Sequence, residues 1–297
     1  MPRFGRVATA MITPYDEQGR VDVDGAVTLA QWLTQHGSEG LVVTGTTGEA
    51  AVLTDDEKVS LWRAIAGAVS VPVVAGAGTY DTHHSIELTK QAEAAGVDGI
   101  LVVTPYYVRP SQAGIESHFR AVASATSLPV MMYDIPGRTG RKIEHATLVR
   151  LASEVDNIVA LKDAAGDPSA TARFLSDAPE GFEVYSGDDA MTLPLLAVGA
   201  VGVVGVATHW AGQVFLEMIE AFERGDVAAA RAANRRLMST FAYETSDANP
   251  YPVPAKRMMR ELGLPAGHLR PPHVESDGEA LAEAARAIIS ELGLTRG

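Results

Sequence analysis

One lysine stands at the end of a short apolar segment, where its amine can act as a nucleophile. Lys162 closes the run NIVAL at residues 157–161, which is rich in β-branched residues and typical of a buried parallel strand. Because desolvation disfavours the ammonium form, we expect the pKa of this amine to be lowered. A free amine of this kind can condense with a ketone to form a Schiff base. A lysine that extends its charge into solvent is the alternative interpretation of the segment.

Other reactive side chains also stand directly after apolar runs. They are Tyr106 and Tyr107, Tyr133 and Arg138, and the segments TGTTGE at 44–49 and SGDD at 186–189. Thr46 and Thr47 are two hydroxyl residues flanked by glycines, which suits a carboxylate or phosphate site, although a tight turn has the same composition. A phenol can shuttle protons near a Schiff-base nitrogen, and a guanidinium can hold a carboxylate in a bidentate fork. The set indicates Schiff-base carbon–carbon chemistry on a 2-keto acid.

The elements that must position these residues recur along the chain as apolar runs separated by amphipathic stretches. Eight runs are predicted as strands, at residues 7–12, 40–43, 71–75, 99–103, 129–133, 158–161, 183–185 and 202–206. Most are continuously apolar, as in a parallel sheet buried on both faces. Eight strand–helix units predict an α/β fold, the (β/α)₈ TIM barrel, whose chemistry lies at the carboxyl ends of the strands. A doubly wound open sheet is the competing architecture, and the absence of a Gly-x-Gly-x-x-Gly after the first strand disfavours it.

The apolar runs stop after Val206, and helical patterns take over at 209–224, 226–244, 254–263 and 277–293. We therefore expect a catalytic barrel over residues 1–224 and a C-terminal helical domain over residues 225–297. The densest basic stretch, Lys256 and Arg257 with Arg260, falls on one of these helices beside Glu261. We interpret it as an ordinary solvated helix face.

Composition excludes several classes of protein. The chain has 297 residues with 24 Lys and Arg against 37 Asp and Glu, a net charge of −13, and no basic cluster, so nucleic-acid binding is not expected. It contains no run of eighteen apolar residues and no apolar N-terminal segment, so neither a membrane span nor a signal peptide is expected. Cysteine is absent, which excludes disulfides and thiolate catalysis and fits a cytoplasmic location.

The sequence predicts no metal site. His83 and His84 are adjacent and the other histidines are scattered without metal-ligand spacing, so this pair is interpreted as surface helix residues. Asp188 and Asp189 are more typical of a helix cap than of a cation site. We therefore expect a reaction carried by side chains, without a metal or cofactor.

The motifs extend in order over nearly the whole chain. They are GTTGE at 45–49, TPYY at 104–107 with RPSQ at 109–112, YDIPGRTG at 133–140, KDA at 162–164, SGDD at 186–189 and NP at 249–250. Together they resemble the dihydrodipicolinate synthase / N-acetylneuraminate lyase family. The Arg-Thr-Gly segment and the double tyrosine resemble its synthase branch. This resemblance implies a lyase that condenses pyruvate with L-aspartate-4-semialdehyde in diaminopimelate and lysine biosynthesis.

The resemblance also implies roles for individual residues. Lys162 would form the Schiff base, and Tyr133, Thr46 and Tyr107 would form a proton relay, with Tyr107 reaching into the site of a neighbouring subunit. The substrate-binding residues would be Thr47 for the pyruvate carboxylate, Arg138 for the semialdehyde carboxylate, and Gly187 and Val204 along the pocket wall. Family members are commonly homotetramers built as dimers of dimers. The sequence leaves open whether Tyr106 or Tyr107 enters the partner.

Four departures from the family pattern and two alternative functions complete the prediction. Asp55 and Lys58 stand where lysine-sensitive members have histidines, and Tyr80 and His84 replace Asn and Glu, so we expect weak or no inhibition by L-lysine. A sister aldolase acting on a sugar acid or another 2-keto acid is the first alternative. A ligand-binding barrel without catalysis is the second.

Overall fold

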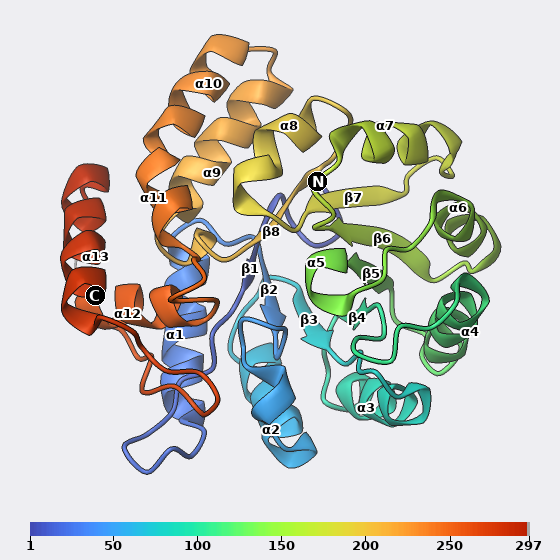
Figure 1. Ribbon diagram of the computed structural model, residues 1–297, viewed down its shortest axis with the longest axis horizontal. Coiled ribbons are helices and arrows are strands. Elements are labelled where there is room, and N and C mark those ends of the chain that lie inside the picture. The colour runs from blue at the N-terminus through green and yellow to red at the C-terminus, as the bar shows by residue number, and fades with distance from the viewer. Residues whose placement is uncertain (296–297) are drawn as a thin grey trace.

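The computed structural model describes residues 1–295 and contains a closed barrel of eight parallel strands (Figure 1). Each strand pairs with the next, and β8 returns to pair with β1. The strands are β1 Val7–Ala10, β2 Gly40–Val43, β3 Val73–Gly76, β4 Gly99–Val103, β5 Val130–Asp134, β6 Ile158–Asp163, β7 Glu183–Ser186 and β8 Gly202–Gly205. All eight predicted strands are confirmed, and the closed barrel rules out the doubly wound open sheet.

Helices surround the barrel as expected for this fold (Figure 1). They are α1 Val23–Gln35, α2 Asp55–Ala66, α3 Thr82–Ala94, α4 Gln112–Ala123, α6 His145–Glu154, α7 Pro168–Asp177, α8 Thr192–Leu196 and α9 Thr208–Glu223. Short helical turns follow three strands: η1 Ala50–Val52, α5 Pro136–Thr139 and η2 Asp189–Met191. Local signals set several starts; at α2, for example, Thr54 and Glu57 form the reciprocal capping box that their spacing predicts.

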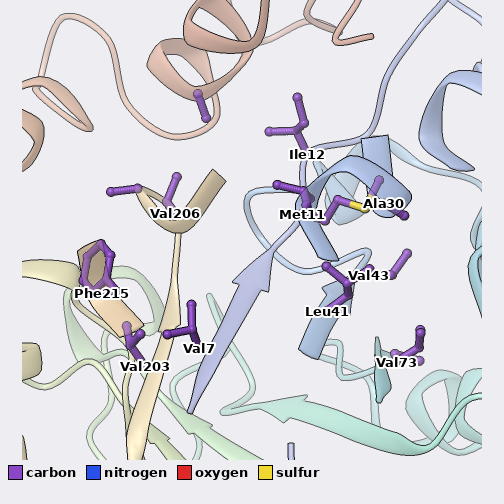
Figure 2. Packing of buried hydrophobic residues seen from close by; sticks show 14 of the residues in the cluster. Val7, Met11, Ile12, Ala30, Leu41, Val43, Val73, Val203, Val206 and Phe215 are labelled. Atoms are coloured by element: carbon purple, nitrogen blue, oxygen red, sulfur yellow. The ribbon is translucent and has the colours of Figure 1, made fainter. Parts of the chain in front are cut away.

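Side chains alternate across each strand and so build two apolar layers. The outer layer lies between strands and helices and includes Val7, Leu41, Val203 and Phe215 (Figure 2). The inner layer fills the barrel and consists of Phe4, Ala8, Ala10, Val42, Val74, Leu101, Met131, Tyr133, Ala160, Tyr185 and Val204. On β6 the same alternation places Lys162 on the side of Ala160, facing the barrel interior.

Beyond α9 the chain forms a helical extension beside the barrel (Figure 1). Its helices are α10 Val227–Arg236, α11 Met238–Tyr243, α12 Val253–Glu261 and α13 Gly278–Leu292. The predicted helical stretches are confirmed, except that residues 226–244 form two helices that meet at Leu237. Within residues 1–295, no helix combines the length and apolar character needed to cross a membrane.

The interpretation of the basic stretch on α12 as a solvated face is wrong. Lys256 is completely buried, and its ammonium pairs with the buried carboxylate of Glu49. Arg257 and Arg260 are partly buried and both pair with Glu275. Charge spacing along one helix cannot reveal partners that lie far away in sequence, so the pattern gave no sign of this burial.

Candidate active site

The structure brings Lys162 and Tyr133 together at the carboxyl ends of neighbouring strands. They are in register on β6 and β5, and both side chains point into the barrel. The Nζ atom of Lys162 lies 4.4 Å from the centre of the Tyr133 ring, and each residue is only 5% exposed. A nucleophilic amine and a phenol therefore share one dry compartment, as the sequence predicts.

Burial adjusts the acidity of both groups. Desolvation lowers the pKa of Lys162 to about 8, while the negative charge of Asp189 raises it and the positive charge of Arg138 lowers it further. Burial also raises the pKa of Tyr133 to about 12, whereas the charge of Arg138 and a hydrogen bond with the Thr46 side chain lower it. At neutral pH the phenol holds its proton, and a useful fraction of the amine is free.

A pocket of about 300 Å³ includes Tyr133 in its wall, whereas Lys162 lies behind this tyrosine and is not among the lining residues. Thr46, Tyr133 and Arg138 line it, so three of the predicted site residues meet around one cavity. Thr47, the next residue of the loop, is buried. The sequence prediction did not assign Tyr106 to the pocket, but the structure places this half-buried tyrosine in its wall.

Neither Gly187 nor Val204 lines this pocket: Gly187 lies beside Lys162, and Val204 lies in the barrel core. A Cβ at position 187 would lie 2.9 Å from Cγ of Lys162, so a glycine is needed for the lysine stem to pass. Val204 is completely buried in the inner layer together with Tyr133 and Ala160.

Tyr107 is placed unlike the other predicted residues. It is 91% exposed, and its backbone is left-handed, with φ at 69°. A left-handed backbone at a bulky non-glycine residue is costly, and such residues cluster at functional sites. The next residue, Val108, is also exposed, and so is Tyr80 in the loop that follows β3. The single chain therefore presents Tyr107 outward, away from its own pocket.

Arg138 lies at the mouth of the pocket on the short helix α5. Its guanidinium carbon lies 5.8 Å from the centre of the Tyr251 ring, a cation–π contact with the C-terminal extension. The C-terminal extension therefore contacts a residue at the mouth of the pocket. The arginine is exposed, which leaves its donors free to bind an anion that enters the pocket.

The sequence did not predict a buried pair of carboxyl groups, Asp189 and Glu244, of which Asp189 lies near the Lys162 amine. Asp188 caps the turn η2, as predicted, but Asp189 is buried and accepts the N–H groups of Val206 and Ala207 at 2.9 and 3.2 Å. Burial and the nearby charges raise the pKa values of Asp189 and of its buried neighbour Glu244. The repeated aspartate was a visible signal, whereas Glu244 is distant in sequence and nothing pointed to it.

The fold and this site define a class: a (β/α)₈ barrel with a buried lysine amine against a tyrosine ring at the carboxyl ends of its strands. The chain belongs to the dihydrodipicolinate synthetase family, whose sequence model matches residues 3–291. The 4-hydroxy-tetrahydrodipicolinate synthase of Acidothermus cellulolyticus is 53% identical over 283 residues, covering 94% of this chain and 90% of that protein. The synthase of the same name from Moorella thermoacetica is 48% identical over 294 residues, with coverage of 98% and 99%.

Solved structures give the same placement. The dihydrodipicolinate synthase of Cyanidioschyzon merolae with lysine bound superposes with a TM-score of 0.95 at 42% identity, covering 99% of this chain and 100% of that one. The dihydrodipicolinate synthase of Bacillus anthracis superposes with a TM-score of 0.93 at 41% identity, covering 98% and 99%. The family resemblance expected from the motifs is confirmed.

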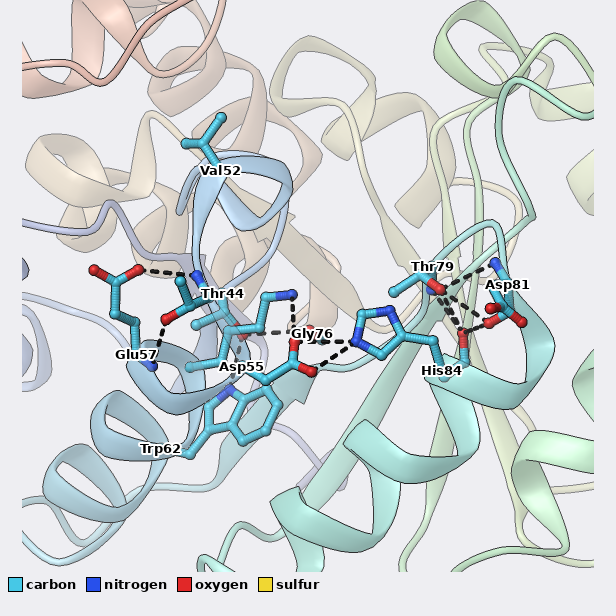
Figure 3. A network of polar contacts seen from close by, with 12 residues as sticks. Thr44, Val52, Asp55, Glu57, Trp62, Gly76, Thr79, Asp81 and His84 are labelled. Atoms are coloured by element: carbon cyan, nitrogen blue, oxygen red, sulfur yellow. Dashed lines mark hydrogen bonds and ion pairs between the residues drawn. The ribbon is translucent and has the colours of Figure 1, made fainter.

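Three of the four residues predicted to depart from lysine-sensitive members interact with one another, and Figure 3 shows the contact between His84 and Asp55. His84 Nε2 lies 2.9 Å from the Asp55 carboxylate, which joins α3 to α2. The buried ammonium of Lys58 lies 3.7 Å from the same carboxylate. His84 is a partly exposed residue of α3, as predicted, and it also contacts a neighbouring helix.

We predict that L-lysine inhibits this enzyme weakly or not at all. A ligand ammonium at these residues would compete with the Lys58 amine, and the Asp55 carboxylate already contacts Lys58 and His84. Activity measured against L-lysine concentration is expected to stay near the uninhibited rate into the millimolar range. The Cyanidioschyzon enzyme, whose structure contains lysine, is the positive control for binding. Strong inhibition at submillimolar lysine would contradict the prediction.

Proposed function

We propose that this enzyme condenses pyruvate with L-aspartate-4-semialdehyde to give 4-hydroxy-tetrahydrodipicolinate, in the biosynthesis of diaminopimelate and lysine. One observation carries the proposal: the buried Lys162 amine, with a pKa lowered to about 8, lies against the ring of Tyr133, which lines an open pocket. The relatives that bear the name of this synthase match the chain along nearly its whole length. The family and the chemistry of the site therefore agree.

The reaction follows from the chemistry of the amine. Lys162 attacks the keto carbon of pyruvate, and loss of water leaves an iminium that withdraws electrons from the methyl group. Loss of a methyl proton gives an enamine, whose carbon attacks the aldehyde of the second substrate. The amino group of that substrate then attacks the iminium carbon, which closes the ring and releases the lysine amine.

Each proton in this sequence needs a donor or acceptor, and each substrate carboxylate needs a partner. We assign proton transfer to Tyr133 with Thr46, joined by Tyr107 from a neighbouring subunit. Thr47 and the adjacent backbone hold the pyruvate carboxylate, and Arg138 holds that of the semialdehyde. Gly187 leaves space for the lysine stem, and Val204 supports Tyr133 from the barrel core.

The same proposal includes a homotetramer and a cytoplasmic location. The 91% exposed Tyr107 supports assembly, because an aromatic side chain in this conformation becomes useful when it is buried in a partner. A sequence without cysteine needs no oxidising compartment. Analytical ultracentrifugation of the wild type and of Tyr107→Ala tests the assembly: the variant is expected to shift toward smaller species.

A substrate screen tests the proposed activity directly. Pyruvate is combined with aspartate semialdehyde, N-acetylmannosamine or simple sugar aldehydes, and product formation from the semialdehyde is followed with a coupled reductase. We expect the highest kcat/KM with the semialdehyde. A higher value with a sugar aldehyde would instead make the protein a sister aldolase.

The rate of Schiff-base formation is expected to depend on pH with an apparent pKa of about 8. Below this value Lys162 is mostly protonated and cannot attack, so the rate rises about tenfold per pH unit; above it the amine is free and the rate levels off. Single-turnover trapping of pyruvate with borohydride between pH 6 and 10 measures this profile. A midpoint near 10.5, the ordinary value for lysine, would contradict a desolvated amine.

A further inference from the structure

The loop that carries Thr46 and Thr47 is bounded by residues in a strained backbone conformation. Thr44 and Glu49 both have left-handed backbones, with φ at 58° and 57°. Between them the turn closes on itself, since the N–H of Glu49 donates to the carbonyl of Thr46 at 3.0 Å. Non-glycine residues persist in this conformation where the surroundings hold them firmly. Something outside the loop must therefore fix Glu49.

The C-terminal extension supplies that constraint. Glu49 is buried, and its carboxylate lies 2.5 Å from the ammonium of Lys256 on α12. The same ammonium donates to the carbonyl of His268 at 2.6 Å and lies 4.0 Å from the centre of the Tyr15 ring. The second oxygen of Glu49 accepts the N–H of Arg270 at 3.1 Å. One carboxylate at the pocket is thus held by two parts of the extension.

The segment around Arg270 is itself docked tightly onto the barrel. The Arg270 guanidinium donates to both oxygens of Glu57 and to the carbonyl oxygens of Val52 and Gly19. Gly267 passes so close that a Cβ there would lie 1.8 Å from the carbonyl oxygen of Tyr15. These contacts leave the extension little freedom relative to the loop after β2.

A buried ion pair is a poor way to gain stability, because desolvation of both charges offsets their attraction. It is a good way to fix geometry, because both partners must stay in place. Glu49 lines the pocket together with Thr46, and a catalytic group displaced by about 1 Å loses on the order of 10²-fold in rate. The position of the pair favours a role in the reaction.

We propose that the Glu49–Lys256 ion pair positions the turn that carries Thr46 and Thr47, so that the C-terminal extension takes part in catalysis. This inference rests on the proposed function and adds two positioning residues to the same site. Neither residue exchanges atoms with the substrate. They act by holding the two hydroxyls where they face pyruvate and the phenol of Tyr133.

The test compares Lys256→Met with Arg257→Met in the full-length protein. Arg257 is the next residue on α12 and forms ion pairs with Glu261 and Glu275 that do not touch the loop. We expect Lys256→Met to lower kcat/KM for pyruvate on the order of 10²-fold while borohydride still traps pyruvate at Lys162. Arg257→Met is expected to keep kcat/KM within about twofold of the wild type, even if its melting temperature falls as much as that of Lys256→Met.

A double-mutant cycle separates positioning from folding. Glu49→Gln alone is expected to cost about as much kcat/KM as Lys256→Met, and the double variant no more than either, since both remove one interaction. Additive losses, a normal kcat/KM in folded Lys256→Met, or unfolding of all three variants would overturn the proposal. Failure of the wild type to trap pyruvate would instead refute the proposed function itself.

Discussion

Replacing Lys162 with alanine is expected to abolish turnover, with a loss of kcat on the order of 10⁴-fold or more. We propose that this amine bonds to the keto carbon, so the substitution removes the nucleophile of the reaction. Lys142, which also lies at the carboxyl end of the barrel, is paired with Asp134 at 3.2 Å. Steady-state assays with pyruvate and the semialdehyde measure the loss, and borohydride should then leave the variant unlabelled.

A matched lysine on the surface serves as control for this substitution. Lys90 on α3 is exposed and pairs with Glu87 at 2.8 Å. Lys90→Ala is expected to keep full activity, since an exposed pair contributes little to stability and lies outside the site. If Lys162→Ala, shown to be folded by circular dichroism, kept more than a few per cent of wild-type turnover, a different nucleophile would have to be sought.

Tyr133→Phe is expected to lower kcat by a factor on the order of 10² to 10⁴, the usual contribution of a positioned acid–base group. The ring that packs against the Lys162 amine remains, so the variant should still bind pyruvate and form the adduct, but more slowly. The phenolic proton, which burial holds in place by raising the pKa to about 12, is lost. The measurement is kcat and KM for each substrate at one pH.

Tyr185 provides the comparison for that variant. It lies on β7 in register with Lys162 on the other side, and it is fully buried. Its hydroxyl, however, donates to Glu183 at 2.6 Å and accepts the N–H of Phe4, away from the pocket. Tyr185→Phe should therefore change stability by about 1 kcal/mol and leave kcat within a few-fold. Equal losses in both variants would mean that packing, not proton transfer, explains the effect.

Sequence periodicity was sufficient to predict the barrel. Eight continuous apolar runs and the intervening amphipathic stretches have short-range physical causes, namely burial of both sheet faces and of one helix stripe. The alternation of side chains along β5 and β6, with Tyr133 and Lys162 in register, places both residues on the same side of neighbouring strands. Reactive residues at strand ends converge in any such barrel, so much of the site could be predicted as well.

Residues that depend on distant partners could not be predicted. Lys256 looked like a solvated charge, because its burial depends on Glu49 and Tyr15 from the other end of the chain. Glu244 contacts Asp189 because the C-terminal extension folds back onto the barrel, and no local pattern marks that contact. Tyr107 was predicted to act in a neighbouring subunit. That role stays a prediction, and testing it requires the assembled enzyme.

The most direct test of the central claim is to locate the pyruvate adduct on the wild-type protein. The enzyme is incubated with pyruvate, reduced with borohydride and digested, and the modified peptide is sequenced by mass spectrometry. We predict one reduced pyruvyl group, carried by the side chain of Lys162, and no label when pyruvate is omitted. An unmodified Lys162, or a label on another lysine instead, would contradict the account.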